Sequence, residues 1–173
     1  MEEHRYGRLQ MNCIVLMRIL IGWHYLYEGF HKFYEPNWSA AGYLKAAKGF
    51  MAPVFHWMAN TQQVLEAMNF MNQWGLTLIG LGLVLGAFTR LAALGGALLV
   101  LLYYLANPSF VGYFSSTPTE GNYLIVNKNL VEMAACLVIA TTYSGRYLGL
   151  DRILHKLFRL APWSKQTTMS ASA

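Results

Sequence analysis

Charged side chains are scarce in this chain. Asp, Glu, Lys and Arg make up 12% of its 173 residues, whereas a soluble domain carries about 25%. Apolar residues account for 55% and aromatic residues for 14%, and aromatic rings gather at both surfaces of a membrane. The composition excludes an ordinary soluble domain and predicts an integral membrane protein of one compact domain.

Cysteine pairs are also absent. The chain has two cysteines, Cys13 and Cys136, and no Cys-x-x-Cys motif. A thiol–disulfide relay needs paired, accessible thiols, so a membrane oxidoreductase of that class is not expected. Both cysteines are interpreted as small buried apolar residues.

Histidine is missing from every predicted membrane helix except the first. His24 and His31 lie about 10 Å apart along that helix, which is too far to bind both faces of one haem. Ligands of a haem or metal converge from several directions. No haem or metal is therefore expected, and an interfacial histidine with a hydrogen-bond partner is the better interpretation.

Long apolar stretches predict an all-α membrane protein built as a four-transmembrane-helix bundle. The stretches cover residues 11–33, 70–88, 91–106 and 127–144. Pro108 ends the third, because proline lacks a backbone N–H. The first contains Arg18 and has no small-residue cleavage site, so it is expected to be a retained anchor.

Two segments outside these stretches are predicted to be helical as well. Residues 34–69 are rich in aromatic side chains, which favours one or two helices at the outer membrane interface. Within them, Asn60 and Gln63 have the spacing of a capping box, so the second membrane helix is expected to begin near Thr61.

The C-terminal part is predicted to be a separate unit. The transmembrane domain covers residues 1–145, a basic amphipathic helix covers 146–165, and 166–173 form a disordered tail. Such a helix lies on the cytoplasmic leaflet against anionic lipid. This accounts for the net charge of +5 without a nucleic-acid partner.

The Lys and Arg distribution predicts the orientation, because these residues favour the cytoplasmic side. We expect the protein to lie in the inner membrane of a bacterial cell with both termini in the cytoplasm. Eight Lys and Arg residues then lie on the cytoplasmic side of the membrane and four lie on the outer side. The four outer residues are Lys32, Lys45, Lys48 and Lys128.

The first stretch carries ionisable residues on one face. Within roughly 40° of Arg18 on a helical wheel lie Gly22, Tyr25, Gly29 and Lys32. We expect this face to point into the bundle, since charge in a membrane helix is costly and usually avoids lipid.

Acid–base pairs four residues apart recur at one level of the bundle. Glu28 precedes Lys32, and Lys128 precedes Glu132. The predicted helix directions place both pairs near the outer surface, and Asn127 and Asn129 join them. The sequence thus predicts that these six polar residues gather in one cluster near the outer surface, whereas Arg18 lies about 15 Å deeper than Glu28.

Two interpretations of this cluster stay open. Alternating acids and bases can neutralise one another and fix helix register, and Lys32 and Lys128 can extend toward water. Alternatively, the cluster is a binding or redox site, for which a quinone headgroup, with two carbonyls and a need for protons, is well suited.

The motifs resemble the DoxX/DoxD family of small four-helix membrane proteins. The first helix contains Arg18-x3-Gly22-x6-Gly29-x2-Lys32, which is similar to the opening pattern of that family. The turn between the second and third helices, residues 86–93, is similar to the family's Gly-x-x-Thr-Arg-x-Ala hairpin, in which Thr89 is expected to cap the third helix. The start of the fourth helix, 127–132, also fits, and the resemblance covers about residues 11–145.

This resemblance implies a membrane subunit of a quinone-linked oxidoreductase, similar to thiosulfate:quinone oxidoreductase, that passes electrons from an extracytoplasmic donor or partner protein to membrane quinone. The expected catalytic residues are Glu28, Lys32 and Glu132. The residues expected to bind the quinone are Arg18, Tyr25, Asn127, Lys128 and Asn129. Since the sequence has no self-contained redox centre, a redox partner protein or a homo-oligomer within the lipid bilayer is expected.

Two other functions remain open. The chain can be a non-catalytic anchor or assembly partner that recruits a redox enzyme through residues 34–69. A small solute permease is a third possibility, although the halves of the sequence show no repeat of the kind found in transporters.

Overall fold

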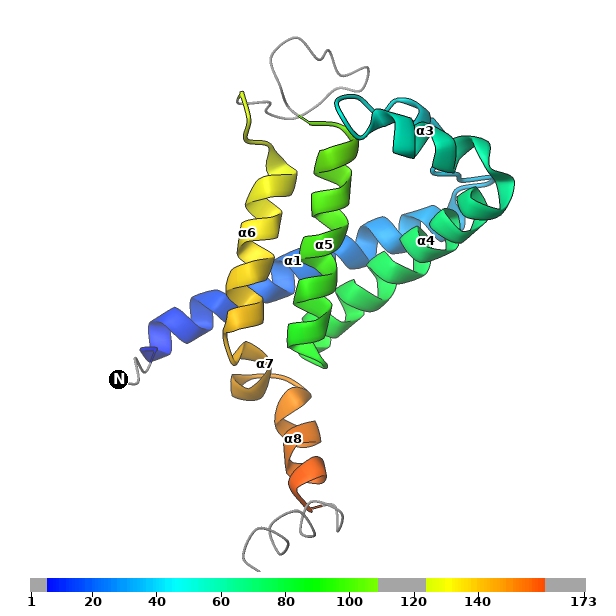
Figure 1. The fold of residues 1–173 in the computed structure, drawn as a ribbon. Coiled ribbons are helices and arrows are strands. Elements are labelled where there is room, and N and C mark those ends of the chain that lie inside the picture. The colour runs from blue at the N-terminus through cyan, green and yellow to red at the C-terminus, as the bar shows by residue number, and fades with distance from the viewer. Residues whose placement is uncertain (1–5, 109–123, 161–173) are drawn as a thin grey trace, which may run out of the picture.

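The computed structural model describes residues 6–108 and 124–160, and within them the chain forms eight helices (Figure 1). They are α1 (Arg8–Tyr34), α2 (Ala41–Lys45), α3 (Ala52–Asn60), α4 (Gln62–Leu85), α5 (Thr89–Ala106), α6 (Lys128–Thr141), α7 (Ser144–Tyr147) and α8 (Asp151–Leu160). The prediction of an all-α protein is confirmed for the described residues.

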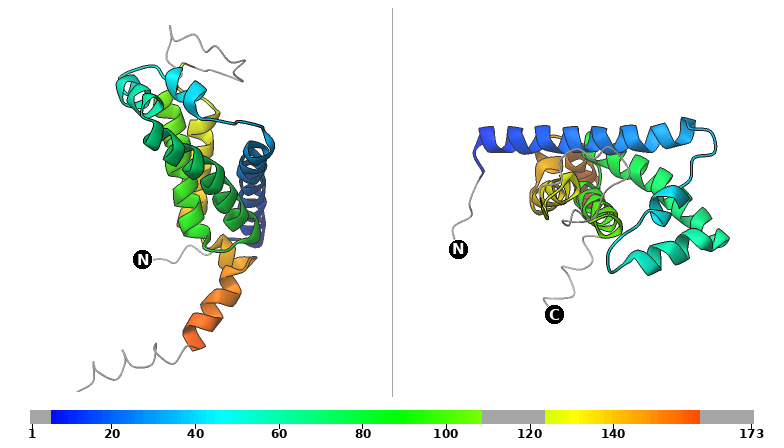
Figure 2. Two further views of the ribbon diagram at one scale, coloured as in Figure 1. Left: turned by 90° about the vertical axis from the view of Figure 1, so that its right-hand side faces the viewer. Right: turned by 90° about the horizontal axis from the view of Figure 1, so that it is seen from above.

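The four long helices pack against one another around a shared core. Helices α5 and α6 lie side by side, and α1 crosses them obliquely (Figure 1). Seen from above, α1 runs along one side of the other helices (Figure 2). The core contains Tyr25 of α1, Leu83 of α4, Val100 of α5 and Ile139 of α6. Each long helix therefore contributes at least one buried apolar residue to the same cluster.

Glycines set the close approach of α1 and α4. A Cβ on Gly80 would lie 2.7 Å from the carbonyl oxygen of Gly22 and 2.7 Å from Cα of Leu26. A Cβ on Gly29 would lie 2.8 Å from the backbone nitrogen of Thr77. The two backbones touch directly, as small residues allow in membrane helices.

Two of these helices have the length and composition that a membrane span requires. Helices α1 and α5 are long and apolar enough to cross a bilayer. Helix α6 has 14 residues, about 21 Å, which is shorter than the roughly 30 Å hydrocarbon layer. Helix α4 is long enough, but its first turns carry Gln62, Gln63 and Glu66. Four transmembrane spans therefore remain a prediction.

The start of α4 partly matches the expectation. The helix begins at Gln62, next to the predicted start at Thr61 and eight residues before the start of the apolar stretch. The predicted capping box is wrong, however: Thr61 is the N-cap, and its side chain makes no capping hydrogen bond. An extended backbone at Thr61 alone separates α3 from α4.

The segment between α1 and α4 contains two short helices, as predicted. Helices α2 and α3 form a second apolar cluster with the end of α5, in which Leu44, Phe55 and Ala106 are buried. The amide of Lys48 donates to the carbonyl of Ala106 (2.8 Å), and the amide of Ala40 donates to Asn69 Oδ1 (2.8 Å). The segment thus covers one end of the bundle.

Hydrogen bonds to Asp151, in the C-terminal part of the chain, stabilise the turn from α4 to α5. Gly86 ends α4 in the left-handed conformation, with φ of 65°. The Asp151 carboxylate accepts hydrogen bonds from the amides of Phe88 (2.7 Å) and Thr89 (3.0 Å) at the start of α5. The prediction that Thr89 caps this helix is wrong, because Thr89 is its first residue and Phe88 is the N-cap.

Helices α7 and α8 follow α6 at this same end, and α8 extends away from the bundle (Figures 1 and 2). Helix α8 begins at Asp151, later than the predicted start at 146, because Leu150 and Asp151 first donate their amides to Leu85 and Gly86. The predicted disordered tail, 166–173, lies outside the described residues.

Candidate functional site

One face of α1 is buried, and it is the face selected by the helical wheel. Arg18, Gly22, Tyr25 and Gly29 are buried, and the Lys32 side chain is only 13% exposed. The opposite face is apolar and exposed, with Leu16, Leu20, Trp23, Tyr27 and Phe30. The expectation that the polar face points into the bundle is confirmed.

Lys32 is held in place by several groups. Its Nζ lies 2.9 Å from Glu28 Oε2 and donates to the Glu28 carbonyl at 3.2 Å. The same Nζ lies 5.5 Å from the ring centroid of Trp38, a distance typical of a cation–π contact. The ammonium thus turns back toward Glu28 and does not extend to the surface.

A second pair connects α1 to α6. His24 Nε2 lies 3.4 Å from Glu132 Oε1, and the Glu132 side chain is 22% exposed. The sequence predicted a polar partner for His24 in preference to a metal or haem, but it did not identify Glu132 as that partner. The useful signal is its position: His24 lies one turn before Glu28, on the side of α1 that faces α6.

The two pairs form one electrostatic group. Glu28 and Glu132 interact with each other, and each also interacts with His24 and Lys128. The sequence predicted that Glu28, Lys32, Lys128 and Glu132 lie together. The structure pairs Lys32 with Glu28 and places Lys128 within electrostatic range of Glu28 and Glu132. We call these four residues and His24 the outer polar cluster.

The asparagines flanking Lys128 differ from the other predicted site residues. Asn127 is the N-cap of α6, and its Oδ1 accepts the amide of Leu130 at 3.2 Å. Asn129 is half-buried in the first turn of that helix. Asn127 thus has a structural function, which explains its place at the start of the helix.

Tyr25 lies beneath the outer polar cluster. It is 1% exposed, its ring packs 5.9 Å from that of His24, and its hydroxyl lies 3.5 Å from Cys136 Sγ. Cys136 is buried, as expected, but Cys13 is exposed on α1. The expectation that both cysteines are buried was wrong for Cys13, because apolar composition alone does not distinguish a core-facing from a lipid-facing position.

Arg18 lies near the other end of the bundle. It is 1% exposed, and its Nη2 donates to the carbonyl of Leu148 at 2.7 Å. Its guanidinium contacts the turn at Gly86 and is attracted electrostatically to Asp151. Since Arg18 lies ten residues before Glu28, about 15 Å along the helix, the structure does not bring Arg18 into the outer polar cluster.

The cluster is suited to hydrogen bonding and proton exchange. It combines two carboxyl groups, a histidine and two lysine ammonium groups, all anchored on α1 and α6. Within residues 6–108 and 124–157, no group of three or more His, Cys, Asp or Glu side chains is arranged to hold a metal ion. The side chains of the cluster can donate hydrogen bonds and transfer protons.

Comparison with known proteins identifies the family. The model of the DoxX family matches residues 13–107, which include α1 with its polar face and the turn from α4 to α5. No curated protein and no solved structure matches the chain. The match covers more than half of the chain, and together with the two apolar helices it shows that the protein is a membrane protein of the DoxX family.

Proposed function

We propose that the protein is a membrane subunit of a quinone-linked oxidoreductase, which receives electrons from an extracytoplasmic partner protein and delivers them to membrane quinone. The observation that carries this proposal is the outer polar cluster. Its ionisable side chains lie on α1, which is long enough to span the membrane, and on the neighbouring helix α6. Such residues are costly in lipid and usually serve a function.

The side chains fit the requirements of a quinone headgroup. A bound quinone would accept two electrons and two protons. The Lys32 ammonium has three donors, two of which are used by Glu28, so one N–H can still donate to a carbonyl oxygen. Glu132 Oε1 and His24 Nε2 lie 3.4 Å apart, so this pair can hold a proton and pass it on.

Orientation follows from the same proposal. We place both termini in the cytoplasm of a bacterial cell and the protein in the inner membrane, so that the outer polar cluster lies toward the extracytoplasmic side. Helices α2 and α3 then cover the extracytoplasmic end of the bundle. Arg18 stabilises the opposite end and does not contact the quinone.

The test compares two lysine substitutions. Lys32→Met removes the ammonium from the cluster, whereas Lys45→Met, the control, removes an exposed ammonium from α2. Binding of a water-soluble quinone analogue to the purified protein is measured by tryptophan fluorescence, and the quinone that co-purifies is measured by mass spectrometry. Loss of one hydrogen bond from a charged donor, about 1.5–3 kcal/mol, should weaken binding about 10- to 100-fold in Lys32→Met alone.

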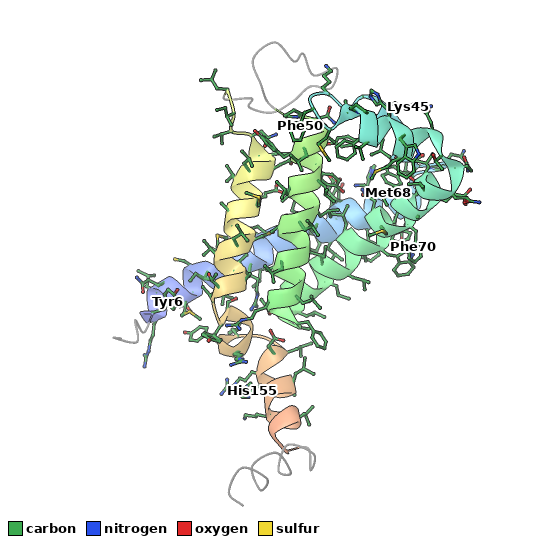
Figure 3. All side chains as sticks on the ribbon, viewed as in Figure 1. Tyr6, Lys45, Phe50, Met68, Phe70 and His155 are labelled. Atoms are coloured by element: carbon green, nitrogen blue, oxygen red, sulfur yellow. The ribbon has the colours of Figure 1, made fainter. Side chains whose placement is uncertain are left out.

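Equal binding by both variants, or no quinone on the wild-type protein, would exclude the quinone function. The second candidate, a non-catalytic anchor, would then be preferred. It is supported by the exposed aromatic residues of the segment before α4, namely Tyr43, Phe50 and Trp57, of which Phe50 is labelled in Figure 3. That outcome should be accompanied by a stoichiometric partner protein that is lost when the three aromatic residues are replaced by serine.

A further inference from the structure

A cavity of about 350 Å³ opens at the end of the bundle opposite α2 and α3. Its walls come from the start of α5, from the junction of α6 with α7, and from α8. Elements far apart in the sequence thus build one depression, at the turn that the Asp151 carboxylate holds. The outer polar cluster plays no part in it.

Two arginines line this cavity and share one aromatic ring. The Arg90 Cζ lies 4.5 Å from the ring centroid of Tyr143, and the Arg146 Cζ lies 5.2 Å from it. Neither arginine forms an ion pair with a carboxylate within the described residues. His155, labelled on α8 in Figure 3, lines the same cavity. Two guanidinium groups held together in this way suit a phosphate, which they can bind through paired N–H donors.

Asp151 also lines the cavity, but among the described residues it forms no ion pair with Arg90 or Arg146. Its two oxygens accept the amides of Phe88 and Thr89, and the carboxylate is attracted to the buried Arg18. The N-terminus of α5 is consequently occupied by a side chain of the protein itself. The ligands available to an anion are the guanidinium groups.

An apolar surface continues from the cavity along α5. Leu91, at the rim, is 71% exposed, and it is followed on the same face of the helix by the exposed Leu94, Leu98 and Leu102. These positions fall within about 80° on a helical wheel. A ligand that pairs with the arginines can therefore place hydrocarbon along this stripe, which a free anion cannot use.

We propose that this cavity binds the phosphate of one anionic phospholipid, with Arg90 and Arg146 contacting the phosphate and an acyl chain lying along α5. Basic pockets among membrane helices are a recognised mode of anionic-lipid binding. The two arginines are exposed, as are Arg152 and Lys156 on α8. The site nevertheless differs from the general attraction of α8 to a membrane, because Arg152 and Lys156 do not line the cavity.

The test compares two double variants that each remove two positive charges. Arg90→Gln/Arg146→Gln changes the cavity, and Arg152→Gln/Lys156→Gln, the control, changes only the surface of α8. The purified full-length protein in detergent is titrated with dioleoyl phosphatidylglycerol or dioleoyl phosphatidylcholine, and lipid adducts are quantified by native mass spectrometry. Circular dichroism and gel filtration verify that each variant is folded.

We expect one phosphatidylglycerol to bind the wild-type protein and the control in clear preference to phosphatidylcholine. The cavity variant should bind phosphatidylglycerol about 25-fold more weakly, from about 5-fold for each lost charge. If the double variant does not fold, the single variants Arg90→Gln and Arg146→Gln should each show the 5-fold loss.

Three results would overturn the proposal. The first is equal binding of the two lipids by the wild-type protein. The second is an equal loss of phosphatidylglycerol binding in the cavity variant and the control, which would show that binding depends only on the net charge of the protein. The third is complete displacement of phosphatidylglycerol by inorganic phosphate at about the same concentration, which would show that the acyl chains add nothing and that the site binds a free anion.

Discussion

Replacement of Gly80 by alanine should separate α4 from α1, the helix that carries Glu28 and Lys32 of the candidate site. The added Cβ would lie 2.7 Å from the Gly22 carbonyl oxygen and 2.7 Å from Cα of Leu26 on α1, and it would also meet the Leu26 amide nitrogen. All of these contacts are backbone atoms, so no side chain can rotate away. The helices can accommodate the methyl group only by moving apart, which also loosens the contacts at Gly22 and Gly29.

Two opposing contributions determine how far Gly80→Ala changes the free energy of unfolding. Overpacking costs about 1–3 kcal/mol, and a contact with backbone belongs at the upper end of that range. Alanine in place of glycine in a helix contributes up to about 1 kcal/mol of stabilisation. The Gly80→Ala substitution should therefore lower the free energy of unfolding by about 2 kcal/mol.

Gly75 provides the matched control. It lies on the same helix, and a Cβ at Gly75 would have no neighbour within 4 Å. Gly75→Ala should leave stability unchanged or raise it by up to about 1 kcal/mol. Unfolding by sodium dodecyl sulfate in mixed micelles, followed by circular dichroism, compares the two variants. If Gly80→Ala proved as stable as Gly75→Ala, the close backbone packing of α1 on α4 would be refuted.

Two further predictions concern the end of the bundle near α8 and the two cysteines. Asp151→Ala removes the acceptor of two amide hydrogen bonds at the start of α5, and it should lower the free energy of unfolding by about 3 kcal/mol in the same micelle assay. Arg152→Ala, one residue further along and exposed, should change it by less than about 0.5 kcal/mol, and similar losses in both variants would argue against the capping contact. A membrane-permeant maleimide should label Cys13, which is exposed, and leave Cys136, which is buried, unlabelled until the protein is denatured. Mass spectrometry of the labelled protein checks this, and rapid labelling of Cys136 in the folded protein would contradict the packing of α6 against Tyr25.

Local patterns predicted much of the fold. The apolar stretches gave the approximate position of each long helix, because hydrophobic periodicity and terminating residues such as Pro108 act within a few residues. The start of α4 was harder to place. Its first two turns are polar, so hydropathy did not mark them, and only the backbone break at Thr61 separates them from α3.

The candidate site was predictable where its members share one helix. Glu28 and Lys32 are four residues apart on α1, so their contact follows from helix geometry alone. The partner of Glu132 was not predictable in the same way. His24 contacts it across the bundle, and the identity of such a contact depends on the crossing and rotation of α1 and α6, which a helical wheel does not contain.

The sequence by itself determined that this is a helical membrane protein with one polar face on its first helix, because composition and the 3.6-residue period are properties of the chain alone. Only the tertiary structure decided which polar groups meet. It placed Arg18 beside Leu148, Asp151 at the start of α5, and Arg90 and Arg146 around Tyr143. These contacts join residues that are distant in the sequence, and they depend on how each helix is positioned by packing, with backbone-to-backbone contacts such as that at Gly80 fixing how closely two helices approach.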